Sequence, residues 1–101
     1  MDVGVDGNGY GEAGNDSLVG EVGDTGYLYL SGGAGNDVLR ATNASTTGYY
    51  AQLNGDAGDD TLIGSATFDY LYGGTGNDSV VAGDGDDYVY GGGGRDSLVG
   101  G

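Results

Sequence analysis

The sequence predicts an all-β solenoid in which short parallel strands stack on one another and tight turns link them. Two observations lead to this prediction. First, a nine-residue pattern recurs along the 101 residues, with glycine at positions one, two and four, aspartate at position six and an apolar residue at position eight. Second, the chain has 26 glycines and no proline, which suits repeated tight turns. One repeat is too short to bury its apolar residue alone, so neighbouring copies must stack.

The repeats divide the chain into a short N-terminal stretch and one domain. Residues 1–10 lack the pattern, and we expect a truncated or irregular half-turn there, followed by a single domain over residues 11–101. Well-formed copies of the pattern occupy residues 11–19, 32–40, 55–63, 73–81 and 91–99. Poorer copies occupy residues 64–72 and 82–90. The other poor half-turns carry insertions at residues 20–31 and 41–54, which we expect to form loops on one face.

Each copy gives six residues of turn and then three residues of strand, in which successive side chains point to opposite faces. Position eight then points inward, and two nine-residue halves complete one coil. The inward residues are Leu18, Leu39, Leu62, Val80 and Leu98 in one sheet and Leu30, Leu53, Leu71 and Val89 in the other. The prediction is therefore a parallel β-roll of about five 18-residue coils with two short-stranded parallel sheets.

The turns supply the oxygen donors that a hard divalent cation prefers. Glycine lets the backbone bend so that carbonyl groups converge, and the sixth-position aspartate adds a carboxylate just before each strand. Because stacked turns place one loop over the next, an ion can lie between two coils. Isolated Asp/Gly turns are usually metal-free surface turns, but five copies in register favour calcium. Magnesium is the weaker candidate, because it demands strict octahedral geometry and retains its water.

The copies GGTGNDSVV (73–81) and GGAGNDVLR (32–40) resemble the calcium-binding nonapeptide of RTX (repeats-in-toxin) proteins, and the resemblance covers almost the whole chain. It implies a hemolysin-type β-roll in which each ion is shared between two neighbouring turns. The implied carboxylate ligands are Asp16, Asp37, Asp60, Asp78 and Asp96. The implied backbone-carbonyl ligands are Gly11, Ala13, Asn15, Gly32, Ala34, Asn36, Gly55, Ala57, Asp59, Gly73, Thr75, Asn77, Gly91, Gly93 and Arg95.

Five well-formed loops leave four gaps between neighbours, so we expect about four calcium ions on that side of the roll. A fifth ion would need the poorer side, where Asp69 and Asp87 are in register with the motif aspartates. There, however, Thr67 and Phe68 replace the glycine and the polar residue of the pattern. We therefore expect one ion or none on the poorer side.

Charge and composition exclude several function classes. The net charge of −14, from 16 acidic residues and two arginines, disfavours binding to nucleic-acid phosphates and to anionic membranes. No apolar run is long enough to span a bilayer, so we expect no membrane insertion. The chain has no histidine, cysteine or lysine to activate a nucleophile, and the motif aspartates are committed to metal. We therefore expect that this chain is not an enzyme.

The outward positions of the poorer sheet form two rows of tyrosines, one with Tyr29, Tyr70 and Tyr88 and the other with Tyr10, Tyr72 and Tyr90. A flat aromatic surface could bind a polysaccharide, a cell-surface partner or an adjoining domain, as an adhesin-like module does. Alternatively, tyrosine is there because it favours strands and stabilises a sheet through cross-strand pairs. Both interpretations stay open.

The resemblance implies a module of a protein that Gram-negative bacteria secrete through a type I system, unfolded in the cytosol and folding on calcium outside the cell. The charge agrees with this expectation, because acidic self-repulsion opposes a compact chain until cations bind, so that metal binding and folding become one equilibrium. The strand edges at both ends of the stack look open. This predicts end-to-end self-association or an excised segment of a larger protein.

Overall fold

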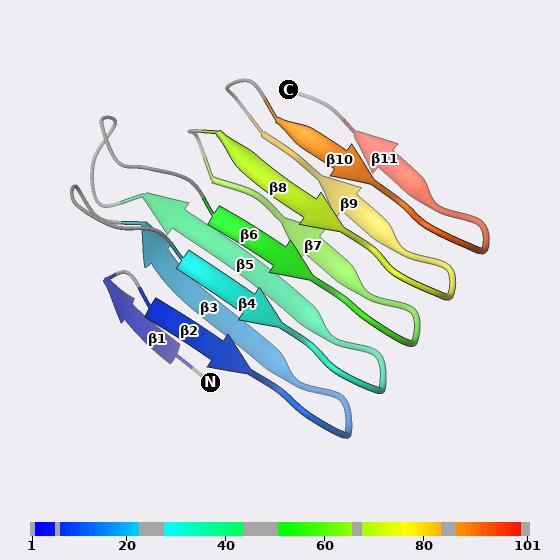
Figure 1. Ribbon diagram of the computed structural model, residues 1–101, viewed down its shortest axis with the longest axis horizontal. Helices are drawn as coiled ribbons and strands as arrows, with labels where there is room; N and C mark the ends of the chain where they lie inside the picture. The colour runs from blue at the N-terminus through cyan, green and yellow to red at the C-terminus, as the bar shows by residue number, and fades with distance from the viewer. Residues whose placement is uncertain are drawn as a thin grey trace.

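A computed structural model describes residues 2–5, 7–22, 28–43, 51–65, 68–83 and 87–99. They form β-strands that alternate between two layers (Figure 1). The strands are β1 (Asp2–Val5), β2 (Gly7–Tyr10), β3 (Ser17–Val22), β4 (Leu28–Ser31), β5 (Val38–Asn43), β6 (Ala51–Asn54), β7 (Thr61–Ile63), β8 (Asp69–Tyr72), β9 (Ser79–Val81), β10 (Tyr88–Tyr90) and β11 (Ser97–Val99).

The strands pair with every second neighbour in sequence, which makes a roll. Odd-numbered strands form a six-stranded sheet in the order β1-β3-β5-β7-β9-β11, and even-numbered strands form a five-stranded sheet in the order β10-β8-β6-β4-β2. All pairs are parallel. The predicted parallel β-roll is confirmed. The described part of the chain contains no helix long and apolar enough to cross a membrane.

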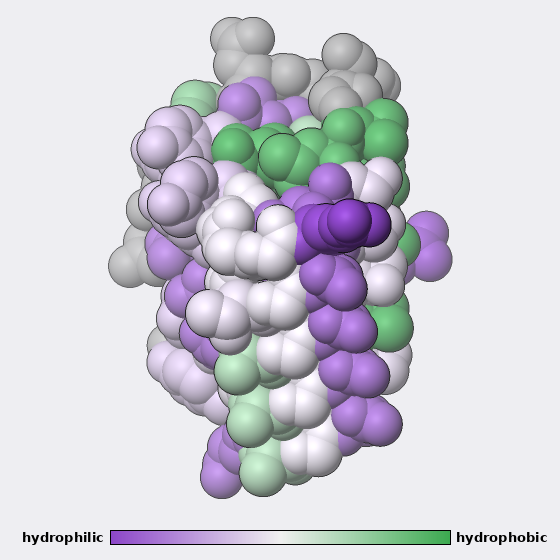
Figure 2. Space-filling model, turned by 90° about the vertical axis from the view of Figure 1, so that its right-hand side faces the viewer, coloured by the Kyte–Doolittle hydropathy of each residue, from purple (hydrophilic) through white to green (hydrophobic). Residues whose placement is uncertain are grey.

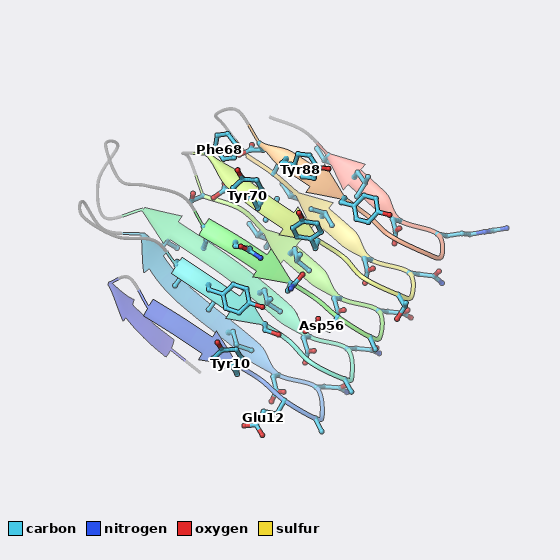
Figure 3. All side chains as sticks on the ribbon, viewed as in Figure 1. Tyr10, Glu12, Asp56, Phe68, Tyr70 and Tyr88 are labelled. Carbon is cyan, nitrogen blue, oxygen red and sulfur yellow. The ribbon has the colours of Figure 1, made fainter. Side chains whose placement is uncertain are left out.

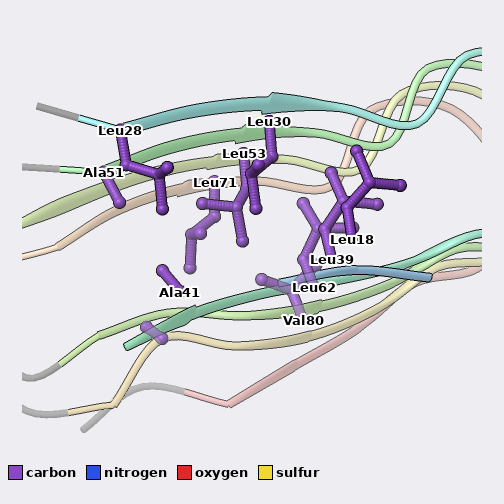
Figure 4. Close-up of a cluster of buried hydrophobic side chains, with 11 residues drawn as sticks. Leu18, Leu28, Leu30, Leu39, Ala41, Ala51, Leu53, Leu62, Leu71 and Val80 are labelled. Carbon is purple, nitrogen blue, oxygen red and sulfur yellow. The ribbon is translucent and has the colours of Figure 1, made fainter. Parts of the chain in front are cut away.

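The core is a thin apolar layer between the two sheets (Figure 4). Most of the predicted inward residues have no solvent exposure, namely Leu18, Leu30, Leu39, Leu53, Leu62, Leu71 and Val80. Val89 is partly buried against this cluster. Leu98 is 49% exposed, because it lies on β11 at the edge of its sheet.

The first coils are wider than the repeat pattern suggests. Strands β3 and β5 pair over six residues, from Ser17↔Val38 to Val22↔Asn43. This lengthening brings further apolar residues into the core, namely Leu28, Ala41 and Ala51. The ranges 20–31 and 41–54, predicted to hold insertions, contain β4 and β6 with the inward Leu30 and Leu53, and their first residues, 20–22 and 41–43, extend β3 and β5 where loops were expected. The physical reason is that a continued parallel ladder pairs backbone groups that a loop must satisfy otherwise. Residues 23–27 and 44–50 lie outside the described residues.

The N-terminal stretch also contributes to both sheets. Strand β1 pairs with β3, and β2 pairs with β4 from Gly7↔Leu28 to Tyr10↔Ser31. Residues 2–5 and 7–10, where the sequence predicted a truncated or irregular half-turn, thus form regular strands. A parallel ladder uses backbone groups, which a glycine-rich stretch supplies even without the repeat pattern.

Candidate metal centre

The well-formed loops stack in register along one side of the roll, where each of them links an even-numbered strand to the next odd-numbered strand (Figure 1). Isolated bridges join Ala13, Ala34, Ala57 and Thr75 in consecutive loops. The fourth-position amide of one loop donates to the third-position carbonyl of the next, as from Gly14 to Ala34 at 3.0 Å. The fourth-position glycines have positive φ, for example 114° at Gly58, which side chains disfavour. The pattern's glycines therefore allow this close stacking.

An oxygen-lined cradle lies beside the first glycine of loops 11–16, 55–60 and 73–78. A Cβ atom placed on Gly55 would lie 2.5 Å from Asp60 Oδ2 and 2.6 Å from the carbonyl oxygen of Gly73 in the next loop. The corresponding Cβ on Gly11 would lie 2.7 Å from both Asp16 Oδ2 and the Gly32 carbonyl oxygen. A carboxylate oxygen of one coil and a carbonyl oxygen of the next thus converge on a space that a side chain would fill.

The motif aspartates link the coils through one oxygen and leave the other without a partner. In Asp37, Asp60, Asp78 and Asp96, Oδ1 accepts the backbone N–H of the motif aspartate in the preceding coil, for example from Asp37 to Asp60 at 2.8 Å and from Asp60 to Asp78 at 2.8 Å. The second oxygen, Oδ2, is buried without a hydrogen-bond partner in Asp16, Asp37, Asp60 and Asp78. Because a buried polar atom without a partner is costly, these oxygens need a proton or a cation.

The electrostatics of these carboxylates point the same way. Burial raises the pKa of Asp60 from its ordinary value of 3.8 to about 7, with further contributions from the carboxylates of Asp78 and Asp37. Burial likewise raises the pKa of Asp37 and of Asp78, and a backbone N–H donor opposes the shift in each case. Without a cation, burial therefore disfavours the charged forms of Asp37, Asp60 and Asp78, and for Asp60 this effect extends to neutral pH.

The available donors fit a hard, oxygen-seeking cation. Among the described residues, no three acidic, histidine or cysteine side chains converge on one point, so the carbonyl groups must complete the ligand shell. The first-position carbonyls of Gly32 and Gly73 face the cradles beside Gly11 and Gly55. The third-position carbonyls of Ala34, Ala57 and Thr75 face the preceding loop, where they accept hydrogen bonds. Calcium accepts such mixed carboxylate and carbonyl shells with flexible geometry.

Other carbonyl groups, which were not predicted from the sequence, face the same gaps. The second-position carbonyl of Asp56 lies against Gly74 of the next loop, and the fourth-position carbonyls of Gly14 and Gly58 lie against Gly35 and Gly76. The signal was present in the pattern, because glycine is required wherever the backbone of a neighbouring loop approaches so closely.

The fifth-position side chains form a second ladder of hydrogen bonds on the outer rim of the loops. This ladder was not predicted from the sequence. Asn15 Oδ1 accepts the backbone N–H of Asn36, and Asn36 Oδ1 accepts that of Asp59, both at 2.8 Å. Asp59 and Asn77 continue the ladder to the backbone N–H of Arg95. These exposed residues belong to a hydrophilic stripe along the turn face (Figure 2). The signal was the short carboxamide or carboxylate at position five of four successive loops.

On the opposite side of the roll, the aspartate has different hydrogen-bond partners. Asp69 is fully buried in the row of Leu28 and Ala51. Ser65 donates to both of its oxygens, through the backbone N–H to Oδ2 at 2.8 Å and through the hydroxyl to Oδ1 at 2.7 Å. Asp69 in turn donates its backbone N–H to Asp87 Oδ1 at 3.0 Å. Burial raises the pKa of Asp69 to about 6. Asp69 and Asp87 are thus neighbours, but both oxygens of Asp69 are engaged within the protein. Thr67 lies outside the described residues.

Two rows of tyrosines lie on the outer face of the five-stranded sheet (Figure 3), namely Tyr29, Tyr70 and Tyr88 in one and Tyr10, Tyr72 and Tyr90 in the other. Tyr29 and Tyr70 align with Gln52 between them, and the row continues to Tyr88. Phe68 joins this face, with its ring centroid 5.0 Å from that of Tyr70. The Tyr70–Tyr88 and Tyr72–Tyr90 centroids are each 6.0 Å apart. Phe68, Tyr70, Tyr72, Tyr88 and Tyr90 therefore make a continuous aromatic patch, which Gln52 and Asn54 separate from the pair formed by Tyr10 and Tyr29.

Comparison with known protein families finds a match that covers most of the chain. The model for the RTX calcium-binding nonapeptide repeat matches four times, at residues 5–25, 29–43, 54–89 and 63–98. These matches include all five stacked loops. No curated protein and no solved structure matches the chain.

Proposed function

Because this chain belongs to the RTX calcium-binding nonapeptide repeat family, we propose that its stacked loops bind calcium ions in the gaps between neighbouring coils. The observation that carries the proposal is the column of buried Oδ2 atoms without partners, which in Asp16, Asp60 and Asp78 lie beside a cradle that holds a carbonyl oxygen of the next loop. Four such gaps exist between the five loops, so we propose about four ions. Asp16, Asp37, Asp60, Asp78 and Asp96 are the proposed carboxylate ligands.

The residues of the chain also support a coupling between calcium and folding. Bound calcium supplies positive charge beside carboxylates that are otherwise buried without compensation. The net charge of −14 opposes compaction in the absence of cations. Unfolded chains lack the stacked loops, so ions bind the folded roll preferentially and stabilise it by mass action. The module is accordingly proposed to fold on reaching a calcium-rich medium.

Proteins with these repeats are typically secreted by bacteria, and the β-roll is a structural calcium-binding module. We therefore propose that this chain acts outside the cell after type I secretion and has no catalytic role of its own. A strongly acidic chain that remains unfolded at the low calcium concentration of the cytosol suits export through a narrow channel.

The deciding experiment is a calcium titration of the purified chain from a chelated start, followed by circular dichroism, with magnesium as the control ion. We expect a cooperative gain of β-signal near millimolar calcium that magnesium does not produce. Calorimetry on the same samples would count the ions. A far-ultraviolet spectrum that is unchanged between chelator and calcium, with no heat of binding, would overturn the proposal.

The aromatic patch favours a second candidate function, the binding of an uncharged polysaccharide or a partner protein. Tyr88 and Tyr90 expose 53% and 57% of their surface, and Phe68 exposes 42%. Aromatic faces of this kind bury apolar area while their hydroxyl groups hydrogen-bond to polar ligands. The double variant Tyr70→Ser/Tyr88→Ser should lose binding on a glycan array while retaining calcium-dependent folding. The candidate fails if the calcium-loaded wild-type chain binds none of the glycans and no surface partner.

A further inference from the structure

The five loops differ in charge although their backbones are alike. The central loop, 55–60, carries three carboxylates, those of Asp56, Asp59 and Asp60. Its neighbours at 32–37 and 73–78 carry one carboxylate each. In the last loop, Arg95 offsets the single carboxylate of Asp96. The two gaps that flank loop 55–60 are therefore the most negative gaps of the stack, and the gap before loop 91–96 is the least negative.

Asp56 connects the central loop to the loop before it. It occupies the second position, where the pattern has glycine, and its φ of 69° lies in the left-handed region that side chains disfavour. Its Oδ2 accepts the Ser31 hydroxyl at 2.6 Å and the Gly33 backbone N–H at 3.1 Å. Both donors belong to the preceding coil, so this carboxylate is fixed at the gap between loops 32–37 and 55–60.

Asp59 connects the central loop to the loop after it, through the backbone N–H of Asn77 at 2.8 Å. The two extra carboxylates also act on the buried ligands. Burial is the largest cause of the raised pKa of Asp37, Asp60 and Asp78, and the negative charge of Asp56 adds to it at Asp37 and Asp60, as that of Asp59 does at Asp78. Their electric field thus reaches the carboxylates whose Oδ2 atoms have no partner.

We infer that calcium enters the two gaps flanking loop 55–60 first, and that Asp56 sets the affinity of the gap between loops 32–37 and 55–60. The gap between loops 73–78 and 91–96 fills last, because Arg95 lowers its negative charge. The inference rests on the calcium binding proposed above and adds an order of filling and the residue that determines it.

The sequence offers a matched control for Asp56. Glu12 is the other residue with positive φ that is not glycine, at 68°, among those that the structure describes. It occupies the same second position in loop 11–16, and both side chains lie on the turn side of the roll (Figure 3). Asp56→Gly and Glu12→Gly each restore the pattern's glycine, relieve the same backbone conformation and remove one carboxylate. A difference between them therefore reports the position of Asp56 at its gap.

Calorimetric calcium titrations of the full wild-type chain and both variants test the inference. Asp56→Gly should weaken the tightest binding step about tenfold, as expected for losing one charge near a divalent ion. Glu12→Gly should leave that step within about twofold of wild type. Equal effects of the two variants, or no weakening in Asp56→Gly, would overturn the inference. A wild-type chain that binds no calcium would instead overturn the proposed function.

Nuclear magnetic resonance gives a second, site-resolved test on the wild-type chain. The backbone amide signals of Asp37 and Asp60 should respond at a lower calcium concentration than that of Asp96. Arg95→Asn should move the response of Asp96 to lower calcium and leave the response of Asp37 in place. Simultaneous responses of all loops in the wild-type chain, or an unchanged Asp96 response in Arg95→Asn, would refute the order of filling.

Discussion

The two sides of the roll place an aspartate at the same point, just before or at the start of a strand, and satisfy it in different ways. On the side of the stacked loops, Asp60 has one oxygen bonded to the preceding coil and one buried without a partner. On the opposite side, Ser65 donates to both oxygens of Asp69. One carboxylate therefore depends on a group from solution, whereas the other is satisfied by the chain itself.

The first glycine of the loop is common to both sides. A Cβ on Gly64 would lie 2.8 Å from Asp69 Oδ2 and 2.4 Å from the Ala82 carbonyl oxygen, much as a Cβ on Gly55 would lie beside Asp60 and Gly73. What differs is the next residue, because Ser65 donates its backbone N–H and its hydroxyl to Asp69 and leaves neither carboxylate oxygen without a partner. The comparison yields predictions that separate calcium response from intrinsic stability.

The largest effect is expected for Asp60→Asn, because Asp60 borders two gaps and its carboxylate supplies charge to both. We expect the calcium concentration at the folding midpoint to rise about tenfold or more. Asp69→Asn is the matched control on the other side, and it should leave the calcium midpoint nearly unchanged while lowering the free energy of unfolding by about 1–3 kcal/mol. Circular dichroism against calcium and against urea measures the two quantities. Equal midpoint shifts in the two variants would contradict the comparison.

The next effect is that of filling a cradle. Gly55→Ala places a methyl group 2.5 Å from Asp60 Oδ2 and 2.6 Å from the Gly73 carbonyl oxygen. Overpacking of this kind costs about 1–3 kcal/mol, and it should also remove one ion from the calorimetric stoichiometry. Gly93→Ala is the control, because its Cβ would meet nothing within 4 Å. An unchanged stoichiometry in Gly55→Ala would mean that the ions lie elsewhere.

A smaller effect is expected on the opposite side from Ser65→Ala. The variant removes the hydroxyl donor to Asp69 Oδ1 and keeps the backbone donor to Oδ2. The free energy of unfolding at saturating calcium should fall by about 1–2 kcal/mol, with the ion count unchanged. Urea denaturation in calcium measures this loss. If Ser65→Ala gained an ion instead, the poorer side would be a latent calcium site.

The smallest expected effect is the dependence of the folding stability on pH. The folded, calcium-free pKa values of Asp60 and Asp69, about 7 and about 6, lie above the ordinary value of 3.8. The folded state therefore binds more protons than the unfolded state, and its stability decreases as pH rises through these values. Without calcium, the roll should be more stable at pH 5 than at pH 8.

Calcium should separate the two contributions to this pH dependence. At saturating calcium, the contribution of Asp60 to the pH dependence of stability, with its midpoint near 7, should disappear because the ion replaces the proton. The contribution of Asp69, with its midpoint near 6, should persist. Protons compete with calcium, so the calcium midpoint should rise as pH falls from about 8 to about 6. Calcium titrations followed by circular dichroism at each pH, together with urea titrations at saturating calcium, measure both. A calcium midpoint that is independent of pH would contradict the assignment.

The sequence predicted those parts of the fold that depend on the strict period. Leu39, Leu62 and Val80 are buried as expected because alternation in a three-residue strand determines which side chain points inward. Likewise, Asp60 precedes its strand as the pattern requires. The strict period also places a glycine at the first position of each loop, where a Cβ would lie against the aspartate of the same loop.

The remaining features depend on contacts between coils that a single repeat does not encode. Strands β1 and β2 have no motif and form through backbone pairing with β3 and β4. The length of β3 and β5 follows from their mutual register. Ser65 gave no signal, because a serine four residues before an aspartate is common and only the folded loop brings it to both oxygens.

The two ladders of the turn face run in opposite senses along the stack. A fifth-position side chain accepts from the following loop, whereas a sixth-position carboxylate accepts from the preceding one. Each loop thus carries, in two adjacent residues, the acceptors that hold both of its neighbours. Duplication of one 18-residue unit within the gene would therefore insert a coil that already matches the coils on either side of it. The roll can therefore lengthen by duplication of a coil without compensating changes elsewhere. The exception is a coil added after loop 91–96, because the side chain of Arg95 has no oxygen atom to accept the backbone N–H of a following loop.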